Sequence, residues 1–186
     1  MQGREILIGV TGGIAAYKTA VLVSRLVQSG AGVTVVMTRS AAELVAPRTF
    51  EALSGRPVPS EMFGPGRIHP HIELSQSADL LCIAPATANI IAKAACGLAD
   101  DLLSTLLLSF EGPVLMAPAM NTVMWEKPSV QRNVKQIQAD GIMLAGPESG
   151  YLSCGQTGAG RMSEPEAIFA AIERILQQRN MRDVSK

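Results

Sequence analysis

The sequence is poor in the residues that mark several large classes of protein. Only 17% of its 186 residues are charged and 4% are aromatic. The formal net charge is zero and no basic block is present, so neither nucleic acid nor an anionic membrane surface is a predicted partner. The apolar runs are short and interrupted by glycine, proline or charged residues, which excludes a bilayer-spanning helix.

Cysteine is also scarce, and no signal peptide is recognisable. Cys82, Cys96 and Cys154 are widely spaced and odd in number. They are therefore expected to be free thiols, and neither a disulfide framework nor a CxxC metal site is predicted. The chain enters a strand-like segment at Glu5–Val10 without the positively charged start and apolar stretch of a secretory signal. We expect a cytoplasmic protein.

What the chain does have is an apolar composition, 47% hydrophobic, in which short β-rich runs alternate with helical patterns. This alternation predicts an α/β fold with a single doubly wound, mostly parallel sheet, Rossmann-like and three-layered (α/β/α). One domain is expected over residues 1–178, followed by a mobile tail, 179–186. Strands are predicted at 5–10, 32–37, 79–84, 113–117 and 142–144, and a short one is considered near 57–60. Helices are predicted at 14–28, 41–53, 87–96, 100–109, 122–140 and 165–178, and a glycine-rich loop at 150–160.

Ligands of doubly wound sheets bind beyond the carboxyl ends of the strands, so the residues that follow each strand are candidates for a cofactor site. After the first strand, Gly12, Gly13 and Ile14 suit a phosphate at a helix N-terminus, although they also fit a plain tight turn. After the second strand, Thr38 and Ser40 flank an arginine, which suits a phosphate monoester. The alternative is that Ser40 only caps the next helix.

A third strand end carries Thr87, which is either a helix cap or a ligand contact, and Asn89, whose amide can pair with a planar polar ring. No acidic residue follows the second strand, where an NAD site would need one for the ribose hydroxyls. Taken together, the three strand ends favour a mononucleotide with a terminal phosphate, and FMN fits better than NAD.

Few residues are candidates for chemistry. The two histidines, His69 and His71, lack the further ligands of a compact metal site, so no metal is predicted. His71 can act as an acid or base. Asn121 is either a helix cap or a hydrogen-bond donor to a substrate carboxylate. Cys154 lies in a glycine-rich segment that is expected to form a mobile lid, and Arg161 either binds an anion or supports that segment.

The segment Pro118–Trp125 matches a PxMNxxMW pattern, and His71–Leu74 and Cys154-Gly155 with Gly160–Met162 follow the same order as motifs of a known family. In these segments the chain resembles the flavin-dependent cysteine decarboxylases, and within them the branch that acts on phosphopantothenoylcysteine. The resemblance extends over nearly the whole chain, from Gly9 to Pro165.

The resemblance implies roles for individual residues. His71 would be the acid/base residue, Asn121 the carboxylate-binding residue and Cys154 a proton donor on the lid, whereas His69 matches no functional position. Known members are homotrimers or assemblies of trimers with active sites between subunits. The implied FMN contacts are Gly12, Gly13, Ile14, Thr38, Ser40, Thr87, Ala88, Asn89, Ile90 and Ala119. The implied substrate contacts are Asn121, Met124, Tyr151, Leu152, Ser153 and Arg161.

The implied activity is the FMN-dependent decarboxylation of 4′-phosphopantothenoylcysteine to 4′-phosphopantetheine in coenzyme A biosynthesis. The flavin would oxidise the substrate thiol to a thioaldehyde, carbon dioxide would leave to give an enethiolate, and the hydride would return while Cys154 supplies a proton. Three alternatives stay open at this point: an oxidative decarboxylase of a peptide C-terminal cysteine, a flavin prenyltransferase and a non-catalytic relative that regulates a phosphatase. Whether the chain stands alone or is half of a bifunctional protein is also open.

Overall fold

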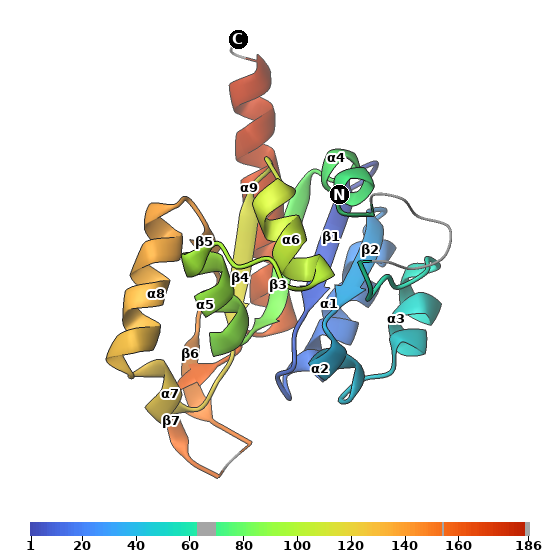
Figure 1. Cartoon of the computed structure of the whole chain (residues 1–186). Helices are drawn as coiled ribbons and strands as arrows, with labels where there is room; N and C mark the ends of the chain where they lie inside the picture. Colours follow the sequence, from blue (N-terminus) through green and yellow to red (C-terminus); the bar gives the residue numbers. More distant parts are fainter. Residues whose placement is uncertain (63–69, 154, 185–186) are drawn as a thin grey trace.

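The computed structural model describes residues 1–62, 70–153 and 155–184 and has at its centre a five-stranded sheet in which every pairing is parallel (Figure 1). The strand order is β2-β1-β3-β4-β5, as in one common type of doubly wound fold. The fold class predicted from the sequence is confirmed. The strands are β1 (Glu5–Val10), β2 (Gly32–Met37), β3 (Leu80–Ala86), β4 (Val114–Pro118) and β5 (Met143–Leu144).

The strands read as continuous apolar runs because helices cover both faces of the sheet. All seven residues of β3 and all five of β4 are buried. One face is covered by α1 (Ala16–Gln28), α3 (Pro47–Ser54) and α9 (Pro165–Val184). The other is covered by α4 (Pro70–Ser77), α5 (Ala88–Cys96), α6 (Leu102–Ser109) and α8 (Pro128–Ala139).

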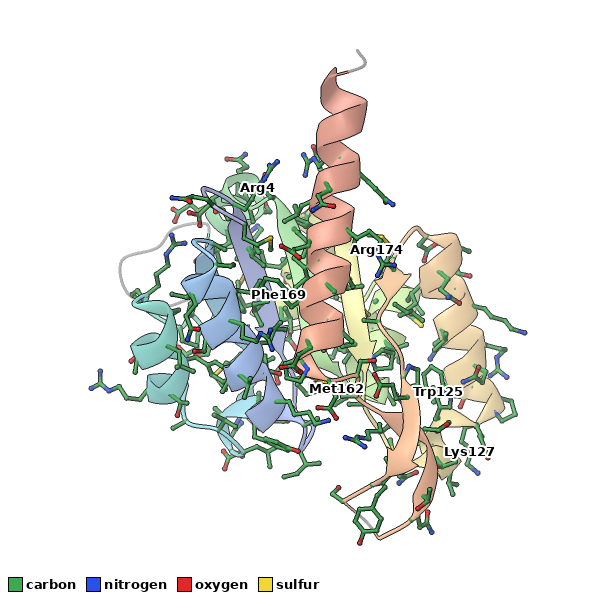
Figure 2. All side chains as sticks on the ribbon, turned by 180° about the vertical axis from the view of Figure 1, so that it is seen from behind. Arg4, Trp125, Lys127, Met162, Phe169 and Arg174 are labelled. Atoms are coloured by element: carbon green, nitrogen blue, oxygen red, sulfur yellow. The ribbon has the colours of Figure 1, made fainter. Side chains whose placement is uncertain are left out.

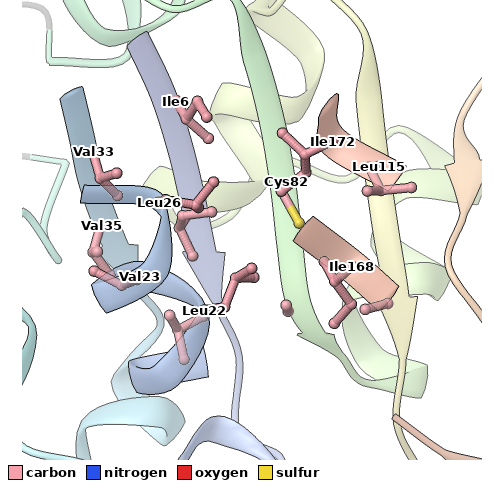
Figure 3. Packing of buried hydrophobic residues seen from close by; sticks show 14 of the residues in the cluster. Ile6, Leu22, Val23, Leu26, Val33, Val35, Cys82, Leu115, Ile168 and Ile172 are labelled. Carbon is pink, nitrogen blue, oxygen red and sulfur yellow. The ribbon is translucent and has the colours of Figure 1, made fainter. Parts of the chain in front are cut away.

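The core on the α1 and α9 side is seen from behind in Figure 2 and from close by in Figure 3. Leu22 and Leu26 of α1 and Ile168 and Ile172 of α9 pack with strand residues such as Cys82 (Figure 3). These side chains are almost fully shielded from solvent, at most 1% exposed. Their spacing along each helix is three or four residues, which puts the apolar positions on the face that meets the sheet.

Two predicted helices are wrong in extent because a proline interrupts each of them. The predicted helix 41–53 is two helices, α2 (Arg39–Ala42) and α3, and Pro47 occupies the first turn of α3. The predicted helix 122–140 is likewise divided into α7 (Thr122–Trp125) and α8, which begins at Pro128. Proline has no N–H to donate, so it is tolerated in the first turn of a helix but not in its interior.

Other segments also differ from the prediction. The predicted glycine-rich loop 150–160 is largely a β-hairpin of β6 (Glu148–Tyr151) and β7 (Thr157–Arg161). Helix α4 was not predicted, the segment 57–60 is not a strand, and α9 continues past residue 178 to Val184. Residues 63–69 with His69, and residue Cys154, lie outside the described residues.

The strand order fixes where a ligand can enter. β1 has β2 on one side and β3 on the other, so the connections after β1 and β3 run in opposite directions and leave a crevice at the carboxyl ends of the strands. Helix α4 lies at the other end of the sheet, where β1 and β3 begin (Figure 1). In the part of the chain that the structure describes, no helix has the length and apolar character needed to cross a bilayer.

Candidate functional site

A cavity of about 870 Å³ opens at the carboxyl ends of the strands. Its wall is built from the residues that follow β1, β2, β3 and β4, together with the β6–β7 hairpin. This volume is in the upper part of the range found for small-molecule and cofactor sites. The cavity therefore occupies the position that the strand order favours for a ligand, and it is large enough for a mononucleotide.

The cavity brings together nearly all of the site residues predicted from the sequence. Of the expected catalytic residues it contains Asn121, but His71 does not line it and Cys154 lies outside the described residues. The predicted residues that line it are Gly12, Gly13, Ile14, Thr38, Ser40, Thr87, Ala88, Asn89, Ile90, Ala119, Asn121, Met124, Tyr151, Leu152, Ser153 and Arg161.

The loop after β1 packs so closely against neighbouring segments that its two glycines have little or no space for a side chain. A Cβ atom on Gly12 would lie 2.5 Å from the Cβ of Ser40, and one on Gly13 would lie 3.2 Å from Cγ of Pro85. The helix that follows has no side-chain cap at Ala15 and no acidic residue in its first turn. The N–H groups of Ala16 and Lys18 donate to the carbonyls of Gly13 and Ala15, and the positive dipole end of the helix at the cavity wall favours an anion.

The structure decides between the two readings of the segment after β2. Thr38 is the residue that caps α2, since its Oγ1 accepts the backbone N–H of Ala41 at 3.3 Å. Ser40 is exposed inside that helix, and its hydroxyl has no partner among the described residues. Arg39, between them, also lines the cavity without a carboxylate partner in the described part. A hydroxyl, a guanidinium and the start of α1 together fit a phosphate group.

The threonine after β3 does not cap its helix. The Oγ1 of Thr11 donates to the carbonyl oxygen of Pro85 at 2.7 Å and accepts the backbone N–H of Thr87 at 3.2 Å. Thr87 makes no capping bond to α5, so the first N–H groups of this helix have no side-chain partner where they meet the cavity. A polar ring edge beside Asn89 would find donors there.

Asn121 caps a helix and also lines the cavity. Its Oδ1 accepts the backbone N–H of Met124 at 2.8 Å and so caps α7. This bond fixes which side of the amide is the acceptor, and it leaves the Nδ2 donors of the exposed side chain on the wall of the cavity. A carboxylate bound beside Asn121 would therefore meet N–H groups.

The hairpin is joined to the Asn121 segment by direct backbone approach. Met120 donates its N–H to the carbonyl of Gly160 at 2.9 Å. A Cβ atom on Gly160 would lie 2.2 Å from the carbonyl oxygen of Met120, and one on Gly158 would lie 2.3 Å from Oγ1 of Thr122. Only glycine fits at these two positions without a shift of the neighbouring chain. The glycines that suggested a mobile loop thus also hold the base of the hairpin against α7.

At the base of the hairpin, two cations share one carboxylate. Glu164 pairs with Lys18, whose Nζ is 2.9 Å away, and also with Arg161. Lys18 also donates to the carbonyl of Met162 at 3.3 Å. The hydrogen bond from Lys18 is the main cause that lowers the pKa of Glu164. Arg161 therefore supports the hairpin and lines the cavity at the same time, so the two readings of this residue are compatible.

Sequence reasoning missed several residues of the wall, among them Lys18, Lys93 and Asp101. A helical signal was available for two of them. Lys18 follows Ile14 by four positions and Lys93 follows Asn89 by four, and residues so spaced share one face of a helix. Charged residues on such a face are candidates for the wall of a site that begins at the helix N-terminus.

His71 lies near the start of α4, at the end of the sheet opposite the cavity (Figure 1). Its side chain is partly buried. A single chain therefore does not bring His71 and Asn121 together. Among residues 1–62, 70–153 and 155–184, no three histidine, cysteine or carboxylate side chains are grouped as a metal site would require.

Comparison with known proteins gives consistent matches. The Flavoprotein family matches residues 1–177. The Coenzyme A biosynthesis bifunctional protein CoaBC of Vibrio vulnificus (strain YJ016) is 43% identical over 187 residues, which are 100% of this chain and 47% of that protein. The chain thus spans about half the length of the curated relatives it matches.

Solved structures show the same likeness over the whole domain. The FMN-dependent cysteine decarboxylase SpaF superimposes with a TM-score of 0.80 at 36% identity, over 95% of this chain and 97% of that chain. A cysteine-to-serine mutant of PPC decarboxylase in complex with pantothenoylaminoethenethiol superimposes with a TM-score of 0.84 at 30% identity. It covers 94% of this chain and 98% of that chain.

Proposed function

Since this chain belongs to the Flavoprotein family, we propose that it binds FMN and decarboxylates 4′-phosphopantothenoylcysteine to 4′-phosphopantetheine, a step of coenzyme A synthesis. The observation that carries the proposal is the cavity itself, because one wall has the features of a phosphate cradle and another presents the Asn121 amide. The relatives support the same reading, one as a coenzyme A biosynthesis protein and two as cysteine or PPC decarboxylases.

The residues present fit FMN. The Gly12–Ile14 loop, the uncapped start of α1 and the free Ser40 hydroxyl would hold the phosphate, and Thr87–Ile90 with Ala119 would border the ring. When bound, FMN would supply a reversible two-electron acceptor, so that the substrate could carry a C=S bond β to its carboxylate, with a sulfur able to take up the electrons as carbon dioxide leaves.

The protein's own side chains orient the substrate. The Nδ2 group of Asn121 would donate to the departing carboxylate. The capping bond from Met124 to Oδ1 fixes the position of the Asn121 side chain. Met124, Tyr151, Leu152 and Ser153 would enclose the rest of the molecule, because they line the mouth of the cavity together with Arg161. Tyr151 is 70% exposed in the isolated chain, so a ligand or a second subunit can cover it.

Cys154 would supply the proton that completes the saturated thiol product. This role distinguishes the proposed reaction from oxidative decarboxylation of a peptide, which stops at the enethiol. Cys154 follows Ser153 in the sequence, and Ser153 lines the cavity.

We further propose that the active protein is a cytoplasmic homotrimer, or an assembly of trimers, with its sites between subunits. His71 and Asn121 lie at opposite ends of the sheet in one chain, so an acid/base role for His71 requires a second copy. An apolar stripe also runs from Ile14, just before α1, onto that helix, and its residues Ile14, Tyr17 and Val21 are 59%, 60% and 48% exposed. Two of the three line the cavity, so a neighbour seated on this stripe would close the site.

The test is purification followed by spectroscopy and product analysis. A yellow protein with the absorption of oxidised flavin is expected, and incubation with the substrate should yield the saturated thiol. Product mass separates the alternatives, because an oxidative decarboxylase gives the enethiol, which lacks two hydrogens. Absence of flavin binding when the purified chain is titrated with FMN would overturn the proposal.

A further inference from the structure

A cluster of three charged side chains lies at the cavity wall beyond the first turn of α5. The Nζ atom of Lys93 lies 2.5 Å from Oδ1 of Asp100 and 2.6 Å from Oδ2 of Asp101. The Lys93 side chain is only 12% exposed. Lys93 and Asp101 both line the cavity, whereas Asp100 does not line it and its side chain is 54% exposed. The cluster belongs to no role considered so far.

The cluster is fixed in place from both sides. Asp101 caps α6, because its Oδ1 accepts the N–H of Ser104 at 2.8 Å, and the hydroxyl of Ser104 is bonded back to the same residue. Lys93 is in the last turn of α5, four residues after Asn89, and therefore faces the same side of that helix. The face of α5 that borders the proposed ring site thus continues directly into Lys93.

The ammonium remains charged despite its burial. Burial alone would lower the pKa of Lys93, but the hydrogen bonds to Asp100 and Asp101 outweigh it, and the net effect raises the pKa. Burial likewise acts to raise the pKa of Asp101, and the bonds from Lys93 and Ser104 reverse it, so that the net effect lowers the pKa. The wall of the cavity therefore presents fixed opposite charges at neutral pH.

We propose that the cluster of Lys93, Asp100 and Asp101 sets the reduction potential of the flavin bound in the cavity. The proposal rests on the flavin site proposed above. Uptake of electrons makes a flavin more electron-rich, so a nearby cation favours the reduced form and a nearby anion favours the oxidised form. Such a charge acts more strongly at the wall of a cavity than in bulk water, because the effective dielectric constant there is lower. The proposed reaction needs electrons to be taken up and given back, so neither form can be strongly favoured.

A purely structural role makes a different prediction. If the ion pairs only joined the end of α5 to the start of α6, then loss of either sign of charge would loosen the same contact and act in the same direction. If the cluster sets the potential, loss of the positive charge must lower the reduction potential and loss of a negative charge must raise it. Substitutions that change one charge at a time and keep the size of the side chain therefore separate the two roles.

The experiment measures the midpoint potential of FMN bound to the full chain, by equilibration with a reference dye. In Lys93→Met the equilibrium constant for reduction should fall about tenfold, which lowers the potential by about 30 mV for two electrons. Asp101→Asn keeps an N-cap residue and should raise the potential, as should Asp100→Asn. Lys93→Arg keeps the charge and should restore the wild-type value.

A matched control removes a similar charge elsewhere. Arg25 pairs with Glu166 between α1 and α9 and does not line the cavity, so Arg25→Met should leave the potential unchanged. Shifts of the midpoint potential in the same direction in the lysine and aspartate variants, or no shift in either, would overturn the inference. The proposed function would remain intact as long as the wild type binds FMN. If Lys93→Met no longer binds FMN, the two aspartate variants test the inference: a raised potential in both supports it, and a lowered or unchanged potential overturns it. Failure of the wild type to bind FMN would overturn both.

Discussion

The Asn121 side chain divides its two polar atoms between the fold and the cavity. Its Oδ1 accepts the N–H of Met124, and its Nδ2 group is left to donate to a ligand. A side chain that keeps the acceptor but changes the charge should therefore affect the reaction and leave the helix unaltered. Few positions in a protein allow the two contributions to be separated so directly.

Asn121→Asp should abolish most of the turnover and leave the stability almost unchanged. The carboxylate still caps α7, so the free energy of unfolding should move by no more than about 0.5 kcal/mol. The added negative charge repels the substrate carboxylate, and like charges brought together cost several kcal/mol, so kcat/KM should fall at least about 100-fold. Steady-state kinetics and denaturant unfolding measure the two effects.

A second variant serves as the control. Asn121→Ala removes the cap as well as the donor, so it should also lose about 1 kcal/mol of stability. Unchanged kinetics in the aspartate variant would contradict carboxylate binding by Asn121.

The described cysteines should differ sharply in reactivity. Burial raises the pKa of the Cys82 thiol from its usual 9.0 to about 12, whereas Cys96 is exposed at the end of α5. Since the thiolate is the reactive form, alkylation of the native protein near neutral pH should modify Cys96 and spare Cys82. Mass spectrometry of the digested protein identifies the modified residue.

The same shift has a consequence for stability at high pH. Because the folded-state pKa of Cys82 is raised, its contribution is complete below about pH 9 and is lost as the pH rises toward 12. Cys82→Ala should therefore weaken the dependence of unfolding free energy on pH across this interval. An alkaline dependence identical to that of the wild type would contradict the assignment.

At the scale of elements, the hairpin and α7 form one unit although the sequence suggested a loop and a long helix. β7 approaches so closely that Gly158 and Gly160 leave no space for a side chain. The segment that carries Asn121 is thereby bonded to the strand that leads away from Cys154. Movement of the hairpin would therefore be transmitted to the Asn121 amide.

Gly158→Ala should loosen this unit. The added methyl would meet Thr122 at 2.3 Å, and such overpacking typically costs about 1–3 kcal/mol. Turnover should fall with stability because the hairpin is displaced from α7. Thr122→Ala in the same chain removes the obstructing atoms, so the double variant should recover most of both quantities, as a double-mutant cycle would measure.

Gly150→Ala in the other strand of the hairpin is the control. Its Cβ would meet only the flexible end of Arg161, so the effect should be small. Equal losses in the two glycine variants would show that the hairpin tolerates no alanine at all and that the contact with Thr122 is not special.

The elements that the sequence predicted best are those with strong periodic patterns. The bounds of β1 and β2 were predicted correctly, and β3, β4 and β5 begin and end within two residues of the prediction. Prolines marked the breaks before α3 and α8, but the apolar spacing on either side was read as continuous. β6 and β7 were missed because short, glycine-containing strands have little apolar alternation.

The cavity was predictable because the residues after parallel strands converge at one edge. The position of His71 was not, because α4 has no clear apolar face and its place in the sequence does not show which end of the sheet it meets.

At the scale of the whole molecule, one chain leaves its cavity open and its histidine remote. The apolar stripe at α1 and the exposed residues beside the cavity together form an apolar surface that is in contact with water in the isolated chain. In a closed ring of identical chains, one repeated contact could both cover the cavity and bring His71 of one chain to the cavity of the next.

Mixing two inactive variants should restore activity. If His71 of one subunit serves the Asn121 of another, a 1:1 mixed assembly of His71→Asn and Asn121→Asp chains should contain intact sites. In every mixed trimer about one site in three receives both native residues, so roughly a third of wild-type activity is expected from the isolated mixed species. Co-expression with two affinity tags isolates the mixed species, and no recovery would mean that each site is formed by one chain.

A charge on the α1 stripe should break the assembly. Val21 is 48% exposed and does not line the cavity, so Val21→Asp should yield monomers by light scattering while the fold is retained. Lys135→Asp on the exposed side of α8 should leave the assembly unchanged. Monomers in the wild-type protein would contradict the proposed oligomer.

The amide that caps α7 also makes the protein vulnerable to slow chemical ageing. Spontaneous hydrolysis of the Asn121 amide would leave an aspartate whose oxygen caps the helix equally well. Aged molecules would then melt, assemble and take up flavin as fresh ones do, yet would not turn over. An old preparation would lose specific activity while every measure of folding stayed normal, and only accurate mass analysis of the peptide would reveal the inactive fraction.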